Sequence, residues 1–70
     1  MKERIINKVY EFRVEKGVTQ EGLAEKVGVS RQTIIAIERG NYTPSVNLAL
    51  KLADFFKVPV EKLFTIIHEK

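Results

Sequence analysis

Two short helical segments separated by only two residues constrain this chain more than any other feature of its sequence. Thr19 is a favourable N-cap for a helix that stops at Gly28, and Ser30 is a favourable N-cap for a second helix that stops at Gly40. Because the connection is so tight, the two helices must cross at a steep angle. The segment 19–40 therefore predicts a helix that rests on its neighbour and leaves one of its own faces exposed.

The rest of the chain predicts three more helices around this pair. Apolar residues recur at helical spacing, and caps or prolines mark the starts. The expected spans are Lys8 to Lys16 after an Asn7 cap, Val46 to Phe56 after a Ser45 cap, and Pro59 through Phe64. The exposed helix of the central pair is expected to run from Arg31 to Arg39. We therefore expect a single all-α domain of five helices over residues 1–70.

Both ends of the chain look like short strands, because residues 4–6 and 65–68 are rich in β-branched side chains. A lone two-stranded ribbon is marginal in water, so paired strands are expected to continue across a dimer axis. The alternative is a frayed tail whose isoleucines cover the core. In the dimer interpretation, the interface residues are Ile5, Ile6, Phe64, Ile66 and Ile67.

Composition disfavours several classes of protein. The chain has no cysteine and one histidine, so disulfides and the common zinc patterns cannot be built. His68 has no nucleophile near it in the sequence, and no glycine-rich phosphate loop occurs, which argues against an enzyme. The apolar runs are too short for a membrane span or a signal peptide. We expect a cytoplasmic protein with no metal, cofactor, small-molecule ligand or membrane partner.

The net charge of +3 is modest, but its placement is uneven. Residues 1–16 and 31–57 each carry a net charge of +2, whereas residues 17–30 carry −1 and residues 58–70 are neutral. Scattered, solvated lysines on a small protein would give a similar pattern. Charge alone therefore does not identify the partner.

The pattern of the central residues resembles the Cro and C1-repressor type helix-turn-helix family, also called the XRE family. The resemblance covers about residues 8–64, and similar short members of the family are usually dimeric prokaryotic or phage regulators. It implies a lambda-repressor-like fold, a helix-turn-helix at 19–40, and a homodimer on a near-palindromic operator in double-stranded DNA. The matching positions are Arg13, Lys16-Gly17, Thr19-Gln20, Leu23-Ala24, Gly28-Val29-Ser30, Thr33-Ile34, Ile37-Glu38, Gly40, Pro44-Ser45 and Ala49.

The resemblance also implies roles for individual residues. The family reads bases in the major groove from the start and outer face of the second helix, which here carries Arg31, Gln32, Thr33 and Ala36. Backbone contacts are implied for Gln20, Ser30, Arg39, Asn41, Tyr42 and Thr43. Arg13 and Glu38 match a pair that forms a structural salt bridge in the family.

Several of these assignments have alternatives. Gln20 could instead be a second helix cap, Arg31 and Gln32 could simply solvate the surface, and Tyr42 could pack on the following helix. Ile35 and Gly22 depart from the family pattern, and Pro59 replaces its usual serine cap. The same fold can also serve as an antitoxin or protein-interaction module. An RNA partner is disfavoured, because the deep, narrow groove of A-form RNA does not admit such a helix.

Overall fold

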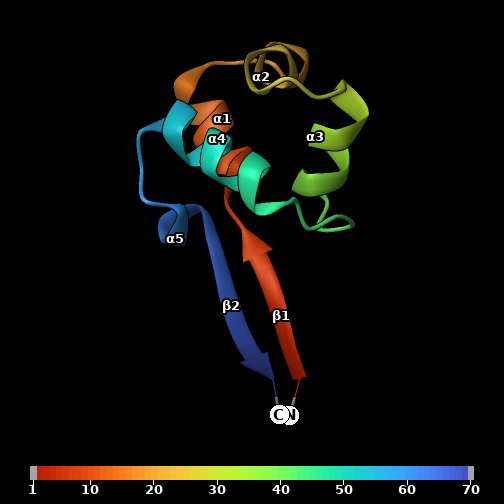
Figure 1. The fold of residues 1–70 in the computed structure, drawn as a ribbon, viewed down its shortest axis with the longest axis vertical. Coiled ribbons are helices and arrows are strands. Elements are labelled where there is room, and N and C mark those ends of the chain that lie inside the picture. The colour runs from red at the N-terminus through yellow and green to blue at the C-terminus, as the bar shows by residue number, and fades with distance from the viewer. Residues whose placement is uncertain (1, 70) are drawn as a thin grey trace.

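A computed structural model describes residues 2–69 as a bundle of five helices from which a two-stranded ribbon projects (Figure 1). The ribbon points away from the helices. The elements in chain order are β1 (Lys2–Asn7), α1 (Val9–Lys16), α2 (Gln20–Val27), α3 (Arg31–Glu38), α4 (Val46–Phe56), α5 (Val60–Leu63) and β2 (Phe64–Glu69).

Hydroxyl caps begin the three central helices at the residues that the sequence predicts. The side chain of Thr19 accepts a hydrogen bond from the backbone of Gly22, at 2.9 Å, at the start of α2. Ser30 and Ser45 cap α3 and α4 in the same way, at 3.2 Å in each case. Each cap satisfies one of the free N–H groups of a first helical turn, so the three predicted caps are confirmed.

Three helices, α1, α2 and α4, end at a residue with left-handed backbone angles. Gly17 and Gly28 follow α1 and α2 with φ of 77° and 79°, a conformation in which glycine avoids the steric cost of a Cβ atom. Lys57 ends α4 in the same conformation with φ of 57°, although it is not glycine. Glycine indicated two of these stops, whereas the end of α4 at Phe56, which was also predicted, has no glycine after it.

One hydrophobic core fills the space between the five helices. Every helix contributes to it, and Leu23, Ile34 and Leu52 are completely buried. The core residues are Val9, Leu23, Ala24, Val27, Ile34, Ile37, Leu48, Leu52, Ala53, Phe56 and Leu63. Gly22, which departs from the family pattern, is half-buried, and a Cβ atom there would lie 3.1 Å from the capping oxygen of Thr19.

The terminal strands pair with each other, so the label all-α is too narrow. Strands β1 and β2 run antiparallel in the register Lys2 to Glu69, Ile5 to Ile66 and Asn7 to Phe64. They are longer than the predicted 4–6 and 65–68, because Lys2, Glu3 and Asn7 extend β1, and Phe64 and Glu69 extend β2. The alternative of a frayed tail is wrong, because the two strands pair with each other within one chain. The continuation of the ribbon across a dimer axis stays a prediction.

Four helix boundaries also differ from the prediction, one of them the start of α5, where Pro59 is the N-cap and the helix begins at Val60. α1 begins at Val9 instead of Lys8, although the Asn7 side chain still accepts a hydrogen bond from the Val9 amide at 3.1 Å. α3 ends at Glu38, one residue early. α5 ends at Leu63 because Phe64 already has extended backbone angles and begins β2. Within residues 2–69, no helix is long and apolar enough to cross a membrane.

Candidate nucleic-acid interface

Helix α3 has a buried inner face and a polar outer face. Its inner side is fixed by Ile34 and Ile37, which are completely buried in the core. Arg31, Gln32 and, just after the helix, Arg39 are exposed. The outer face therefore offers a guanidinium group and an amide at the start of the helix and a second guanidinium group at its end.

Smaller side chains complete the outer face of α3. Thr33 and Ala36 are half-buried, and so is Ile35, which therefore does not lie free in solvent. The hydroxyl groups of Ser30 and Thr33 are 3.1 Å apart and share a hydrogen bond. All four residues predicted to read bases, Arg31, Gln32, Thr33 and Ala36, thus lie on this one short helix.

The tight turn between α2 and α3 depends on two small residues. Ala24 is buried, and its carbonyl oxygen accepts hydrogen bonds from both Gly28, at 2.9 Å, and Val29, at 3.0 Å. A larger side chain at position 24 would separate the helices, since protein interiors are close-packed. This arrangement holds α3 at the surface of the bundle (Figure 1).

A mostly buried ion pair joins α1 to the end of α3. The Nε atom of Arg13 lies 2.6 Å from Oε2 of Glu38, and a second nitrogen of the same guanidinium donates to Oε1 at 3.2 Å. Only 12% of the Arg13 side chain and 6% of the Glu38 side chain are exposed. Arg13 also donates to the carbonyl oxygen of Val18, at 2.9 Å, just before α2. The salt bridge that the resemblance implies is therefore present.

Gln20 shares this ion pair, a contact that sequence reasoning missed. Its Nε2 atom donates a hydrogen bond to Oε1 of Glu38 at 3.1 Å. The helix cap at this point is Thr19, so the alternative role of Gln20 as a second cap is not seen. Glu38 consequently connects α1, α2 and α3, and the amide of Gln20 keeps a second N–H that can bind another group.

A polar hollow lies between the starts of α2 and α3. Its walls bring the first turns of the two helices together with the guanidinium groups of Arg13 and Arg31. Helix N-termini carry partial positive charge, which favours an anion such as a phosphate. Glu21 opposes this with its own carboxylate and Arg13 is already paired with Glu38, so the attraction would come mainly from Arg31 and the two helix starts. The lining residues are Arg13, Thr19, Gln20, Glu21 and Arg31.

The loop after α3 is the other predicted backbone-binding region. Asn41, Tyr42 and Thr43 are exposed there. Tyr42 also borders a hollow whose other walls include Asn47 and Lys51 of α4. Its ring thus lies near α4 and still presents nearly half of its surface to solvent, 47%.

Asn7 has a second role that the sequence analysis did not anticipate. Its Nδ2 atom donates to the carbonyl oxygen of Ile37 at 2.9 Å. That carbonyl lies in the last turn of α3 and also accepts a hydrogen bond from the Gly40 amide at 3.0 Å. Asn7 therefore anchors the base of the ribbon to the end of α3, and no local sequence signal could have revealed a contact over 30 residues.

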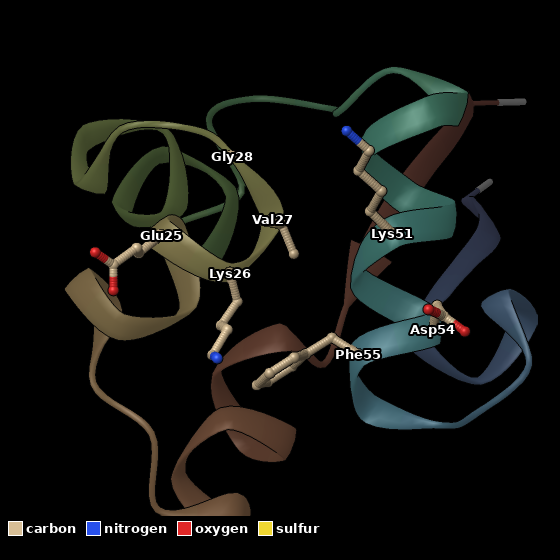
Figure 2. Close-up of a pocket in the computed structure, with 7 residues that line it drawn as sticks. All are labelled: Glu25, Lys26, Val27, Gly28, Lys51, Asp54 and Phe55. Carbon is tan, nitrogen blue, oxygen red and sulfur yellow. The ribbon is translucent and has the colours of Figure 1, made fainter.

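A further hollow separates the end of α2 from α4 (Figure 2). In that view the ring of Phe55 extends toward α2 and Lys26, whereas Lys51 and Asp54 extend in different directions. The walls mix both signs of charge with one aromatic ring, and among residues 2–69 no three His, Cys, Asp or Glu side chains could hold a metal ion. We assign no ligand to this hollow.

Most of the chain is similar in sequence to known proteins. The helix-turn-helix family HTH_3 matches residues 9–63. An HTH-type transcriptional regulator of Methanocaldococcus jannaschii is 57% identical over 58 residues, which cover 83% of this chain and 88% of that protein. The family match spans all five helices.

Two more relatives show what similar proteins do. The transcriptional repressor RstR of the cryptic phage CTXphi, from Vibrio cholerae, is 37% identical over 81% of this chain and 51% of its own length. The restriction-modification controller protein C.AhdI of Aeromonas hydrophila has a similar solved structure, with a TM-score of 0.73 and 33% identity over 79% of this chain and 83% of its own.

Proposed function

This chain belongs to the HTH_3 helix-turn-helix family of XRE-type transcriptional regulators, and from that premise we propose that it is a homodimeric repressor that binds one near-palindromic operator. Its helix-turn-helix domain marks it as a DNA-binding regulator and not an enzyme. The observation that carries the finer proposal is the polar outer face of α3, where Arg31 and Gln32 are exposed on a helix fixed from behind.

In the proposed complex, α3 enters the major groove. That groove is about 12 Å wide and admits an α-helix. The guanidinium group of Arg31 can bind a guanine through two hydrogen bonds, and the amide of Gln32 can bind an adenine likewise. Thr33 and Ala36 lie on the same helix and offer a hydroxyl and a methyl group to neighbouring bases, the latter suited to a thymine methyl.

Phosphate contacts would flank α3 on both sides. Gln20 and Ser30 lie before it, at the polar hollow and at the α3 cap. Arg39, Asn41, Tyr42 and Thr43 lie after it, and all four are exposed. Contacts on both sides would fix the register of α3 in the groove without adding sequence preference.

The ion pair of Glu38 supports the same proposal. An unpaired carboxylate at the end of α3 would repel the phosphate backbone. Here Arg13 neutralises that carboxylate, and the pair is almost entirely buried. The side of α3 that would approach DNA consequently presents Arg31 and Arg39 without an opposing free charge from Glu38.

A dimer would place two copies of α3 about 34 Å apart, one turn of DNA, and thereby select a two-fold symmetric site. The terminal ribbon is the proposed interface. Of the five apolar residues expected there, Ile5, Phe64 and Ile66 share one face of the ribbon, whereas Ile6 and Ile67 lie on the other. Repression is proposed because RstR is a repressor, and the site of action would be the prokaryotic cytoplasm or nucleoid.

Selection of bound sites from a random duplex library tests the proposal directly. We expect the selected sequences to converge on two inverted half-sites whose centres are 10–10.5 base pairs, or a multiple, apart. No enrichment after repeated rounds would contradict DNA binding and favour the protein-interaction alternative. Enrichment of single half-sites would contradict the homodimer.

A further inference from the structure

The terminal ribbon carries isoleucines on both of its faces. In an antiparallel pair, opposed residues share a face and successive residues alternate between faces. The register therefore divides the ribbon into an Ile5 face and an Ile6 face. The Ile5 face holds Glu3, Ile5, Asn7, Phe64, Ile66 and His68, and the Ile6 face holds Lys2, Arg4, Ile6, Thr65, Ile67 and Glu69.

The two faces differ in how their apolar residues are arranged. On the Ile5 face, Ile5 and Ile66 are direct partners, and they are 43% and 55% exposed. On the Ile6 face, Ile6 is opposite Thr65 and Ile67 is opposite Arg4, so no two isoleucines are direct partners. Arg4 also forms an ion pair with Glu69, at 3.3 Å, on that face.

The apolar surface of the Ile5 face also continues into the body of the protein. The next pair on the same face is Asn7 with Phe64, and Phe64 packs against the hydrophobic core. At the tip of the ribbon, Nδ1 of His68 lies 3.7 Å from Oε2 of Glu3, so polar groups border the apolar surface there. The Ile5 face is thus an apolar surface bounded by polar groups at the tip of the ribbon.

We propose that two copies of this chain dimerise by stacking their ribbons antiparallel through the Ile5 face, with Ile5 and Ile66 at the centre. This inference rests on the proposed homodimer and names the surface that forms it. A second copy is the fitting occupant because stacking covers exposed isoleucines that a two-stranded ribbon cannot bury alone. Pairing the strand edges instead would leave Ile5 and Ile66 exposed.

The dimensions of the chain agree with this arrangement. The described residues extend 37 Å along the longest axis, and six residues of strand span about 20 Å of it. The centre of the helical body is then roughly 18 Å from the middle of the ribbon, so antiparallel stacking sets two bodies roughly 37 Å apart. Adjacent major grooves on one side of a duplex repeat every 34–36 Å or so.

The side on which α3 lies also favours stacking over edge pairing. In Figure 1 the two strands lie side by side, and α3 lies beside the body on the β1 side. If two ribbons stack face to face, the two-fold axis runs parallel to the plane of the ribbon and perpendicular to its strands. Rotation about this axis keeps both α3 helices on the same side of the dimer. If the ribbons paired through their strand edges, the two-fold axis would be perpendicular to that plane. The two α3 helices would then lie on opposite sides of the dimer and could not reach one duplex together.

The size of the ribbon sets the strength of this contact. Two strands about 4.8 Å apart and about 20 Å long present roughly 200 Å² per face, whereas a standard interface buries about 800 Å² per partner. The dimer should therefore be weak in solution and be completed on DNA. Its monomer and dimer should exchange with protein concentration, which makes occupancy of a palindromic site steeply dependent on the amount of protein.

Two neighbouring isoleucines provide a matched test. Ile5→Lys and Ile6→Lys place the same charge on adjacent residues of β1 but on opposite faces. In sedimentation equilibrium over a wide concentration series, we expect Ile5→Lys to weaken dimerisation by about tenfold or more and Ile6→Lys to change it by less than about twofold. Equal effects, the reverse order, or a wild-type protein that stays monomeric both free and on a palindromic duplex would overturn the proposal.

Folding and DNA binding are measured on the same samples. If circular dichroism shows that a lysine variant is unfolded, the pair Ile5→Thr and Ile6→Thr decides instead, because threonine keeps the β-branched side chain that strands favour. Every folded variant should bind a single half-site duplex as the wild type does. Loss of half-site binding by the wild type would contradict the proposed DNA-binding function, while the comparison of Ile5 with Ile6 would still decide the dimer face.

Discussion

Replacing Glu38 by alanine should cost this small domain a large part of its stability. Glu38 accepts hydrogen bonds from Arg13 at 2.6 and 3.2 Å and from Gln20 at 3.1 Å, and both charged side chains are almost fully buried. Removing one partner of a buried ion pair costs about 3–5 kcal/mol, because the other charge remains without compensation. A chain of 70 residues has a total stability of roughly 4–10 kcal/mol.

The assay is urea and thermal unfolding followed by circular dichroism. Because about 1 kcal/mol corresponds to roughly 4–8 °C in a domain of this size, Glu38→Ala should lower the melting temperature by about 12 °C or more. Glu69→Ala is the matched control, since its ion pair with Arg4 is exposed and such pairs contribute about 1 kcal/mol or less.

A double variant separates charge burial from packing. Arg13→Met combined with Glu38→Leu removes both charges and keeps side chains of similar size, so it should recover most of the stability that Glu38→Ala loses. If Glu38→Ala costs no more than Glu69→Ala, the reasoning about the buried pair is wrong. If the double variant is as unstable as the single one, the loss comes from packing instead of an uncompensated charge.

Four other changes have definite expected outcomes. Ser30→Ala should lower the free energy of unfolding by about 1 kcal/mol in urea titration, because the Thr33 amide loses its cap. Lys57→Gly should raise it by up to about 1 kcal/mol, because glycine relieves the left-handed backbone. Gln32→Ala should weaken binding to the selected duplex by about 1–3 kcal/mol in fluorescence anisotropy and leave random duplex unchanged; equal losses would contradict base reading. Arg39→Gln should weaken binding to all duplexes alike and reduce the slope of log Kd against log salt by about 1.

Local chemistry made much of the helical fold predictable from the sequence. Thr19, Ser30 and Ser45 cap their helices with their own side chains, so the start of each helix is encoded within three residues. In the same way, Gly17 and Gly28 mark the ends of α1 and α2 through their own backbone conformation. The stop at Lys57 lacked such a residue, and only the nearby Pro59 indicated that the helix could not continue.

The contacts that cross the fold were harder to predict. The resemblance implied the pair of Arg13 and Glu38, but the hydrogen bonds from Gln20 and Asn7 depend on how α1, α2 and α3 pack. Nothing in the local sequence specifies such packing. Likewise, β-branched residues indicated two strands, whereas the register that pairs Ile5 with Ile66 follows from where the helical body places the two chain ends.

The positions of the residues proposed to read DNA remain predictions from family resemblance, now placed on defined elements. All four proposed base contacts lie on α3, and the proposed backbone contacts lie at the start of α2, at the α3 cap, at the end of α3 and in the following loop. Sequence reasoning could therefore identify the segment that forms the exposed helix. Which side chain meets which base depends on the complex.

The most direct test of the whole account is an NMR titration of the labelled protein with the selected palindromic duplex. We predict that the largest chemical-shift changes fall on the amides of residues 30–36, with smaller ones at the start of α2 and in the loop 41–43. Changes confined to α4 or to the ribbon, with α3 unaffected, would contradict the assignment of α3 as the DNA-reading helix.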